Sequence, residues 1–201
     1  MKRLAVFCSG SGTNLQAIID AIRGKKLQAI LSLVISDRKN ALALKRAKSA
    51  GIDTLVLTAR QYPSRKQYDQ ALLRVLKARK IDAVILAGFM RILGRPLVRA
   101  YRHRILNIHP ALLPSFPGTT AVRDALEHGV QVTGVTIHFV DEGVDTGPIL
   151  FQETVSVRPT DTEKTLHERI HRVEHHLYPR AIELLLQEKF RVVGRKVELI
   201  R

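Results

Sequence analysis

The sequence predicts an α/β protein built on an open, mostly parallel twisted sheet with helices on both faces. Three observations lead to this prediction. Short apolar runs alternate with amphipathic helical segments through the first half of the chain. The apolar runs are nearly continuous, which is typical of parallel strands covered on both faces. Helix caps stand where strands and helices should meet. Repeated strand–helix–strand units of this kind form a parallel, Rossmann-like sheet.

Five strands and three helices are expected in the first half of the chain. The strands are the apolar runs 3–8, 29–36, 53–57, 82–88 and 104–109, and the helices between them are 13–24, 41–51 and 64–80. Gly24 and Gly51 stand where the first two helices should end, and glycine is common at helix C-termini. Ser64 is suited to cap the start of the third helix.

The second half of the chain does not continue the regular alternation of strands and helices. Its expected elements are a loop at 111–122, a short helix at 123–129, strands at 133–141 and 147–157, and a long amphipathic helix at 162–187. Pro114 and Pro117 punctuate the loop, and Pro179 is expected to kink the long helix. Ligands of such sheets bind beyond the carboxyl ends of the strands, so residues that follow strands are the candidates for chemistry.

Length and composition fit a single domain with a well-buried core. The chain has 201 residues, 45% of them hydrophobic, and a formal net charge of +15. Residues 1–110 carry 22 Lys and Arg against 5 Asp and Glu, whereas residues 111–201 carry 11 against 13. Basic segments without interleaved aromatic side chains are more typical of a solvated surface than of a single-strand groove. We therefore do not expect nucleic acid as a partner, although a basic nucleic-acid-binding module stays open as an alternative.

The chain carries no pattern of a membrane protein. No apolar stretch approaches the roughly 18 residues of a spanning helix, and the run after Lys2 and Arg3 is too short for a signal peptide. We expect a cytoplasmic protein without a membrane partner. The single cysteine, Cys8, lies in the first apolar run and is expected to be a buried small apolar side chain rather than a nucleophile.

The turn 10–14, with the sequence GSGTN, follows the first predicted strand and opens the first predicted helix. This arrangement directs backbone N–H groups and the positive end of a helix dipole at an anion. The dinucleotide pattern GxGxxG would need a third glycine where the chain has Leu15. Asp37 follows the second strand in the manner of a ribose-binding acid, so a nicotinamide-dependent enzyme is kept as a minor alternative. A single phosphate is the favoured ligand of this turn.

A second cluster follows the fifth strand. Alternation along the strand places Asn107 and His109 on the same side, where an amide donor and an imidazole can reach one developing oxyanion. The segment 138–148 supplies several carboxylates, among them Asp145. A carboxylate beside His109 is expected to raise its pKa and to orient the ring for acid–base catalysis. Each of these residues alone has an ordinary structural explanation, but together they indicate an active site.

Four segments together resemble a known family. They are SGSGTNLQAII (9–19), LAGFMRIL (86–93), LNIHPALLPSFPG (106–118) and TGVTIHFVDEGVDTGPIL (133–150). With these motifs the chain resembles the phosphoribosylglycinamide formyltransferases, folate-dependent enzymes of purine synthesis, over essentially its whole length. The resemblance implies transfer of a formyl group from 10-formyltetrahydrofolate to the amine of glycinamide ribonucleotide, with no metal.

The resemblance also assigns roles to individual residues. Asn107, His109 and Asp145 fall on the family's catalytic residues, and Gly12, Thr13, Asn14 and Glu174 fall on residues that bind the ribonucleotide. The folate side is matched by Arg65, Met90, Arg91, Ile92, Leu93 and Asn107, and by the loop residues Val140, Asp141, Glu142, Gly143, Val144 and Asp145. The chain departs from the family at 119–122, where it reads TTAV, so these residues receive no role.

The same resemblance implies a domain organisation and a set of partners. It implies one formyltransferase domain, 1–201, with a ribonucleotide-phosphate half at 1–110 and a half at 111–201 that carries the folate loop and the C-terminal helix. The expected partners are the two small-molecule substrates, in a monomer or homodimer. A methionyl-tRNA formyltransferase is a rival, but it normally adds a C-terminal domain. A formyl-folate hydrolase is another, and it normally adds an N-terminal regulatory domain.

Overall fold

Seven strands form one central sheet in the computed structural model, which describes residues 1–200. They are β1 (Lys2–Cys8), β2 (Ala29–Ser36), β3 (Thr54–Val56), β4 (Ala83–Leu86), β5 (Ile105–His109), β6 (Val132–Phe139) and β7 (Ile149–Ser156). Their order across the sheet is β3-β2-β1-β4-β5-β6-β7. Strands β1 to β5 run parallel, whereas β6 and β7 are antiparallel to their neighbours. The predicted open, mostly parallel sheet is confirmed.

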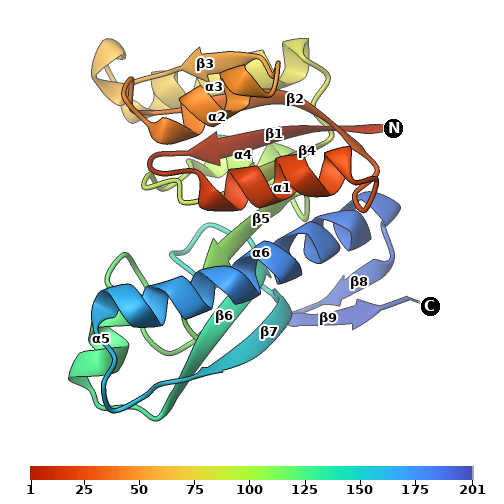
Figure 1. Cartoon of the computed structure of the whole chain (residues 1–201). Coiled ribbons are helices and arrows are strands. Elements are labelled where there is room, and N and C mark those ends of the chain that lie inside the picture. The colour runs from red at the N-terminus through yellow and green to blue at the C-terminus, as the bar shows by residue number, and fades with distance from the viewer. Residues whose placement is uncertain (201) are drawn as a thin grey trace.

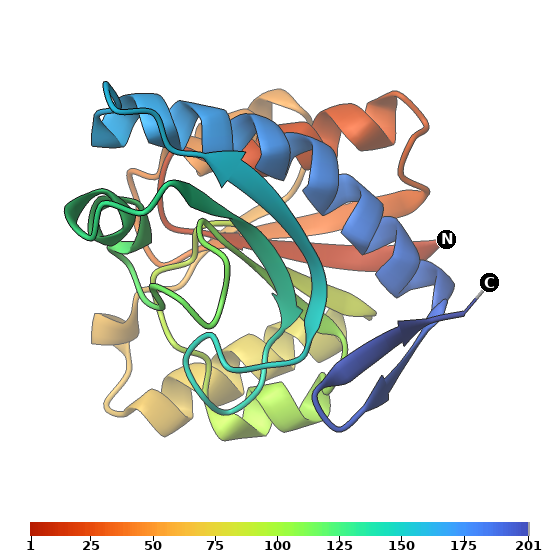
Figure 2. The same cartoon turned by 90° about the horizontal axis from the view of Figure 1, so that it is seen from below.

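Helices cover both faces of this sheet (Figures 1 and 2). They are α1 (Thr13–Arg23), α2 (Leu42–Ser49), the short 3₁₀ helix η1 (Ala59–Gln61), α3 (Arg65–Ala78), α4 (Arg95–Ala100), α5 (Ala121–Glu127) and α6 (Glu163–Gln187). Alternation along β1 shows the two faces: Leu4, Val6 and Cys8 belong to the apolar cluster that includes α1, α2 and α6. Ala5 and Phe7 belong to the cluster that includes α3 and α4. The strands are therefore buried on both sides, as their continuous apolar runs predict.

Predicted helix ends agree with the structure. The Ser64 side chain accepts a hydrogen bond from the backbone N–H of Gln67 and caps α3. Gly51 has a φ of 73° just after α2, a backbone conformation that side chains with a Cβ rarely adopt. Cys8 is fully buried, and burial raises the pKa of its thiol to about 12, so it is not a nucleophile at neutral pH. No helix within residues 1–200 is long and apolar enough to cross a membrane.

The long helix α6 spans the sheet and reaches the ends of its central strands (Figure 1). The Tyr178 hydroxyl donates to the carbonyl oxygens of Leu86 in β4 and Leu106 in β5, at 2.7 and 3.1 Å. The helix continues through Pro179 as one element to its end at Gln187. This buried anchor fixes the preceding turns of α6 beside the carboxyl ends of β4 and β5.

Three elements lie outside the sequence prediction: η1, α4 and a C-terminal hairpin of β8 (Phe190–Val193) and β9 (Lys196–Leu199). Helix α4 has only six residues, too few to show a helical period. The hairpin strands are short and largely exposed, so they lack the continuous apolar runs that mark the central strands. Phe190 nevertheless joins the hairpin to the core, because its ring packs 4.9 Å from that of Phe139.

Candidate active site

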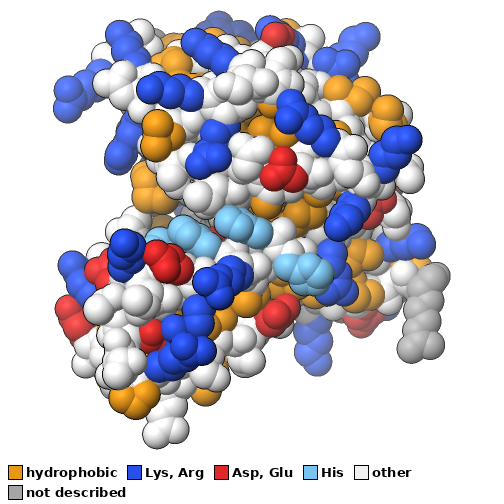
Figure 3. Space-filling view, viewed as in Figure 1, with side chains coloured by type: hydrophobic (Ala, Val, Ile, Leu, Met, Phe, Trp, Pro, Cys, Tyr) orange, Lys and Arg blue, Asp and Glu red, His pale blue; other side chains and the backbone are white. Residues whose placement is uncertain are grey.

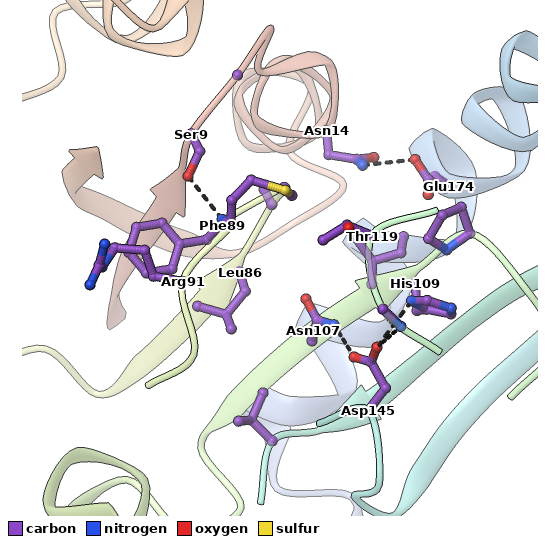
Figure 4. Close-up of a pocket in the computed structure, with 18 of the residues that line it drawn as sticks. Ser9, Asn14, Leu86, Phe89, Arg91, Asn107, His109, Thr119, Asp145 and Glu174 are labelled. Atoms are coloured by element: carbon purple, nitrogen blue, oxygen red, sulfur yellow. Dashed lines mark hydrogen bonds and ion pairs between the residues drawn. The ribbon is translucent and has the colours of Figure 1, made fainter. Parts of the chain in front are cut away.

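A cavity of about 560 Å³ opens at the carboxyl ends of β1, β4 and β5. Its walls come from the turn after β1, the segment after β4, the end of β5, the loop between β6 and β7, and one side of α6. Figure 4 shows these side chains pointing into the cavity from elements far apart in the sequence. The cavity therefore lies where open α/β sheets bind their ligands.

Asn107, His109 and Asp145 meet on one wall of this cavity (Figure 4). Asn107 and His109 are two residues apart at the end of β5 and lie on the same side of the strand, as alternation predicts. The Nδ2 atom of Asn107 is 3.4 Å from Asp145 Oδ1, and Nδ1 of His109 is 3.5 Å from Asp145 Oδ2. Three residues predicted from two separate motifs are thus brought into one cluster.

The imidazole of His109 is buried, and each of its two nitrogens has a polar neighbour. Its Nε2 lies 2.7 Å from the carbonyl oxygen of Phe116, and because a carbonyl only accepts, Nε2 carries a proton. Burial lowers the pKa of His109, and this effect outweighs the raising effects of Asp145 and of the Phe116 carbonyl. The expectation that the carboxylate would raise the pKa of His109 above its usual value is therefore wrong for the substrate-free enzyme. The neutral ring is favoured at pH 7.

Asp145 remains ionised despite its burial. Burial alone would raise its pKa, but hydrogen bonding with His138 and with the backbone N–H of Gly118, together with the nearby imidazoles, lowers the pKa below its usual value. The Gly118 N–H donates to Oδ2 at 2.9 Å. Asp145 has a φ of 53°, a conformation that Asp and Asn tolerate better than most residues. The loop thus presents a fixed charge to His109.

His138 is a member of this cluster that the sequence prediction left without a role. Its Nδ1 lies 2.9 Å from the carbonyl oxygen of Phe139, and because a carbonyl only accepts, Nδ1 carries a proton. Its Nε2 lies 3.2 Å from Asn107 Nδ2 and 3.5 Å from Asp145 Oδ1. His138 pairs with Asn107 across β5 and β6, which is visible only once the strand register is known.

The turn 10–14 forms the opposite wall of the cavity. Gly12 has a φ of 72° and caps α1, and a Cβ at this position would lie 2.7 Å from Cα and Cβ of Ala43. The Arg46 side chain donates through Nε to the carbonyl oxygen of Ser11 at 2.9 Å, which supports the turn from behind. The N-terminal backbone groups of α1 therefore border the cavity, and binding of an anion there stays a prediction from the sequence.

Asn14 and Glu174 join this turn to α6. Asn14 Nδ2 donates to Glu174 Oε2 at 2.8 Å in a buried contact, and both side chains line the cavity (Figure 4). Within the described part of the chain, Asn14 Oδ1 is buried without a hydrogen-bond partner. Burial raises the pKa of Glu174 to about 7, although the bond from Asn14 opposes the shift. A polar ligand with a hydroxyl or amine donor would satisfy Asn14.

Glu174 is expected to lower the stability of the fold as the pH rises. Its pKa is about 7 in the folded chain against 4.5 for the ordinary group, so the unfolded state ionises first. The cost is absent below pH 4.5 and grows to about 3 kcal/mol above pH 7. Urea unfolding should find Glu174→Gln more stable than the parent at pH 8 and nearly equal at pH 4.5. A constant difference between the two pH values would refute the raised pKa.

Asp37, which motivated the nicotinamide alternative, is not among the residues that line the cavity. Its carboxylate accepts a bond of 2.6 Å from the Ser9 hydroxyl, which in turn accepts one of 2.9 Å from the backbone N–H of Met90. Asp37 therefore ties the ends of β1 and β2 to the segment after β4. The structure therefore does not support the alternative of a nicotinamide-dependent enzyme.

Most of the residues matched to the folate side line the cavity. They are Met90, Arg91, Ile92, Leu93, Asn107, Val140, Asp141, Gly143, Val144 and Asp145. Met90, Ile92 and Val144 are about half exposed, and exposed apolar side chains that gather at a cavity mark a ligand site. This wall suits a flat, largely apolar ring system.

Arg65 and Glu142 are placed outside the cavity lining. The Arg65 guanidinium donates to the carbonyl oxygens of Ile92 and Leu93 at 3.1 and 3.2 Å, so it holds the shape of that wall from behind. Glu142 turns toward α4 and forms ion pairs with Arg95 and Arg99, at 2.9 and 2.7 Å. Both residues fix segments of the wall without facing its interior.

The segment 119–122, where the chain departs from the family pattern, divides between two environments. Thr119 lines the cavity, whereas Val122 belongs to α5 and is buried in the core. The Thr120 hydroxyl donates to Asp124 within the first turn of α5. Other lining residues without a predicted role are Ser9, Phe89, Gly118, His138, His167 and His171. Their signal in the sequence is weak because they become neighbours only through the fold.

The fold and the site define an α/β enzyme with a glycine-containing turn at a helix N-terminus and an Asn–His–Asp cluster in one cavity. Residues 2–182 match the family model described as formyl transferase, so the chain belongs to the formyl transferase family. It is 40% identical to phosphoribosylglycinamide formyltransferase of Bacillus subtilis, over 92% of this chain and 95% of that protein. The solved structure of glycinamide ribonucleotide transformylase 1 from Symbiobacterium toebii superposes with a TM-score of 0.98 at 48% identity, covering 100% of this chain and 95% of that one.

A longer relative contains a similar segment. The trifunctional purine biosynthetic protein adenosine-3 of Drosophila pseudoobscura pseudoobscura is 50% identical over 195 residues. That match covers 96% of this chain but only 14% of the length of the relative. The resemblance to the phosphoribosylglycinamide formyltransferases is confirmed by these comparisons.

Proposed function

We infer that this chain transfers the formyl group of 10-formyltetrahydrofolate to the amine of glycinamide ribonucleotide, giving formylglycinamide ribonucleotide and tetrahydrofolate. One observation carries this conclusion: a single cavity joins an anion-binding helix N-terminus to a cluster of Asn107, His109 and Asp145. The names of the full-length relatives support the same reaction. Both substrates are small molecules, and the reaction belongs to purine biosynthesis.

The two substrates occupy opposite ends of the cavity in this proposal. Gly12, Thr13 and Asn14 hold the phosphate of the ribonucleotide through the N-terminal groups of α1, and Glu174 binds the same substrate. The apolar wall of 90–93 and 140–145 receives the folate ring. The amine and the formyl carbon then meet beside Asn107, His109 and Asp145.

The chemistry follows from the charges of the cluster. The neutral amine attacks the formyl carbon, and the carbonyl oxygen gains negative charge in a tetrahedral intermediate. His109, neutral in the substrate-free site, gains proton affinity as this charge develops, because an adjacent anion raises the pKa of an imidazole. The ionised Asp145 accepts a proton from the attacking amine through water and passes it to the folate nitrogen. The intermediate then collapses: the bond between the formyl carbon and the folate nitrogen breaks, and the oxyanion becomes the carbonyl oxygen of the product.

The amide of Asn107 has to turn to take part in this step. In the substrate-free site its Nδ2 faces His138 and Asp145, at 3.2 and 3.4 Å. These are long bonds that an oxyanion can replace. One preorganised donor of this kind is worth about 3 kcal/mol in the barrier. We place Asn107 as that donor.

The organisation of the chain forms part of the same proposal. We propose one domain over 1–201, with the phosphate half at 1–110 and the folate-loop half at 111–201, acting in the cytoplasm as a monomer or homodimer. The contact of Asn14 with Glu174 supports a single unit, because it joins the two halves across the cavity. A shared apolar cluster of α1, α2 and α6 supports it as well.

The proposed reaction is tested by following the change in folate absorbance on addition of the two substrates. Turnover of 10-formyltetrahydrofolate should depend on glycinamide ribonucleotide. Turnover at the same rate without the ribonucleotide would instead identify a hydrolase. Steeply salt-dependent binding of tRNA or duplex DNA without formyl transfer would favour the nucleic-acid-binding module.

Replacing Gly12 with Ala is expected to raise the KM for glycinamide ribonucleotide by about tenfold or more, because the added Cβ meets Ala43 and distorts the phosphate turn. The KM for the folate should change much less. Gly51→Ala is a matched control, since Gly51 has nearly the same φ of 73° but open space around its Cβ position. Steady-state kinetics with each substrate varied separately checks the prediction. Equal rises in both KM values would count against a phosphate at this turn.

The basic half of the chain is expected to favour folates that carry longer anionic polyglutamate tails. Arg91 lines the folate wall, and Arg65 supports it from behind. At low ionic strength the KM for a polyglutamylated donor should be severalfold below that for the monoglutamate, and added salt should narrow the gap. Identical KM values at low salt would mean that the surplus charge serves another purpose.

A further inference from the structure

Three histidines stack along the side of α6 that borders the cavity. His167, His171 and His175 are one helical turn apart, and their ring centroids are 4.1 and 5.8 Å from one to the next. His167 and His171 line the cavity. In Figure 3, histidine side chains form a row across the middle of the molecule, where α6 runs in the same view in Figure 1. We call His167, His171 and His175 the histidine column.

Glu174 connects the column to the turn 10–14. His171 Nε2 lies 3.8 Å from Glu174 Oε2, and the same oxygen accepts the hydrogen bond from Asn14 of the turn. Next along α6, the Nε2 of His175 is buried without a hydrogen-bond partner within the described chain. The column is therefore a partly buried polar surface beside the turn 10–14, and at His175 it carries a ring nitrogen that the described part of the chain leaves without a partner.

We propose that the histidine column is a proton-accepting wall of the phosphate site, so that a phosphate monoester dianion binds on the turn 10–14 together with a proton taken up by the column. This rests on the proposed function, which puts the phosphate of the ribonucleotide on that turn. The rings stack instead of converging on one point, and no group of metal-ligating side chains is found within residues 1–200. A proton is therefore a better match to this geometry than a metal ion.

The surroundings of the column keep its three rings neutral until the anion binds. Burial lowers the pKa of all three rings, and with the neighbouring imidazoles it lowers that of His171 to about 4. The charged groups that act on the column are Glu163 and Glu174 of α6 and Arg46 of α2; the turn 10–14 contributes no ionisable side chain. A dianion adds the negative charge that favours imidazolium.

The stacking also limits the column to a single charge at a time. Two imidazolium ions at 4.1 Å would repel each other strongly in a partly buried site. One proton can instead be held by whichever ring lies closest to the phosphate. The site thereby gains a cation in the bound state while the empty cavity carries no excess charge on this wall.

The test uses the whole chain, with ribose 5-phosphate as the probe. Calorimetry at pH 7.0 in two buffers of different ionisation enthalpy counts the protons taken up on binding. We expect on the order of half a proton or more for the parent, and much less for His171→Gln with about tenfold weaker binding. His176→Gln is the matched control, because His176 neighbours the column on α6 but is exposed to solvent, and it should behave as the parent.

A second measurement identifies the group that receives the proton. In NMR titrations of the parent, the His171 ring should show a pKa at least about three units higher with ribose 5-phosphate than without it, because half a proton at pH 7.0 requires a ring pKa near 7. An unmoved ring pKa with the probe bound overturns the proposal. So does proton uptake that persists in His171→Gln and disappears in Glu174→Gln, since the proton would then reside on Glu174. Formyl transfer is measured on the same samples. If the parent transfers the formyl group but takes up no proton on binding ribose 5-phosphate, the histidine proposal fails and the proposed function stands.

Discussion

Asp145→Asn is expected to lower kcat by about 10²–10⁴-fold while both substrates continue to bind. The variant keeps the shape of the side chain and the backbone conformation at φ 53°, which Asn also tolerates. It removes the charge that faces His109 at 3.5 Å and the acceptor for the proton of the attacking amine. Substrate contacts lie mostly elsewhere, so the effect falls on the chemical step. Calorimetric binding together with kcat measured against pH checks both halves of this result.

The direction of the His109 pKa adds a second criterion. Burial already lowers this pKa, and Asp145 is the main effect that opposes the lowering. Without the carboxylate the pKa should fall further, and the imidazolium form should become harder to reach as the oxyanion develops. NMR titration of His109 in parent and variant follows this change. An inactive variant with an unmoved His109 pKa would leave Asp145 a role in proton relay or loop geometry only. A kcat of the variant close to that of the parent would show that Asp145 has no role in the chemical step.

Asn107→Asp is expected to lower kcat/KM by about 10²–10³-fold at pH 7. The substitution keeps the shape but replaces the only donor group of Asn107 with an acceptor. It also places a second carboxylate 3.4 Å from Asp145 Oδ1, where two like charges repel. One of the two carboxyl groups should then titrate with a raised pKa.

Carboxyl titration of the Asn107→Asp protein distinguishes this account from a simple loss of shape. NMR should find one group of the pair protonated well above the usual range of an aspartate, and the parent should show no such group. Asn107→Asp with kcat/KM within a few-fold of the parent would show that the amide donor is not used. Circular dichroism of parent and variant controls for misfolding.

The sequence predicted the parts of this protein that depend on local patterns. The continuous apolar run of β1 marked a strand buried on both faces, and Ser64 marked the start of α3. Asn107 and His109 were found because alternation on a single strand is enough to put them on one side. Asp145 came from another motif, and only the family resemblance joined it to them.

What the sequence missed depends on burial and on long-range packing. The pKa of His109 was misjudged because desolvation, which no local pattern reveals, outweighs the neighbouring carboxylate. His138 joins the cluster through the pairing of β5 with β6. Glu142 lies outside the cavity lining because its carboxylate forms ion pairs with two arginines of α4. His171 lines the cavity because α6 packs across the sheet, where the Tyr178 hydroxyl bonds to the carbonyl oxygen of Leu86. In each case the fold decides which side chains become neighbours.

The most direct test of the central claim follows the formyl carbon itself. The chain is incubated with glycinamide ribonucleotide and 10-formyltetrahydrofolate carrying a ¹³C-labelled formyl group, and the products are analysed by mass spectrometry and ¹³C NMR. The proposed reaction places the label on the glycinamide nitrogen as formylglycinamide ribonucleotide, with one unlabelled tetrahydrofolate released for each labelled product. Label that appears as free formate, or that stays on the folate in the presence of the ribonucleotide, would contradict it.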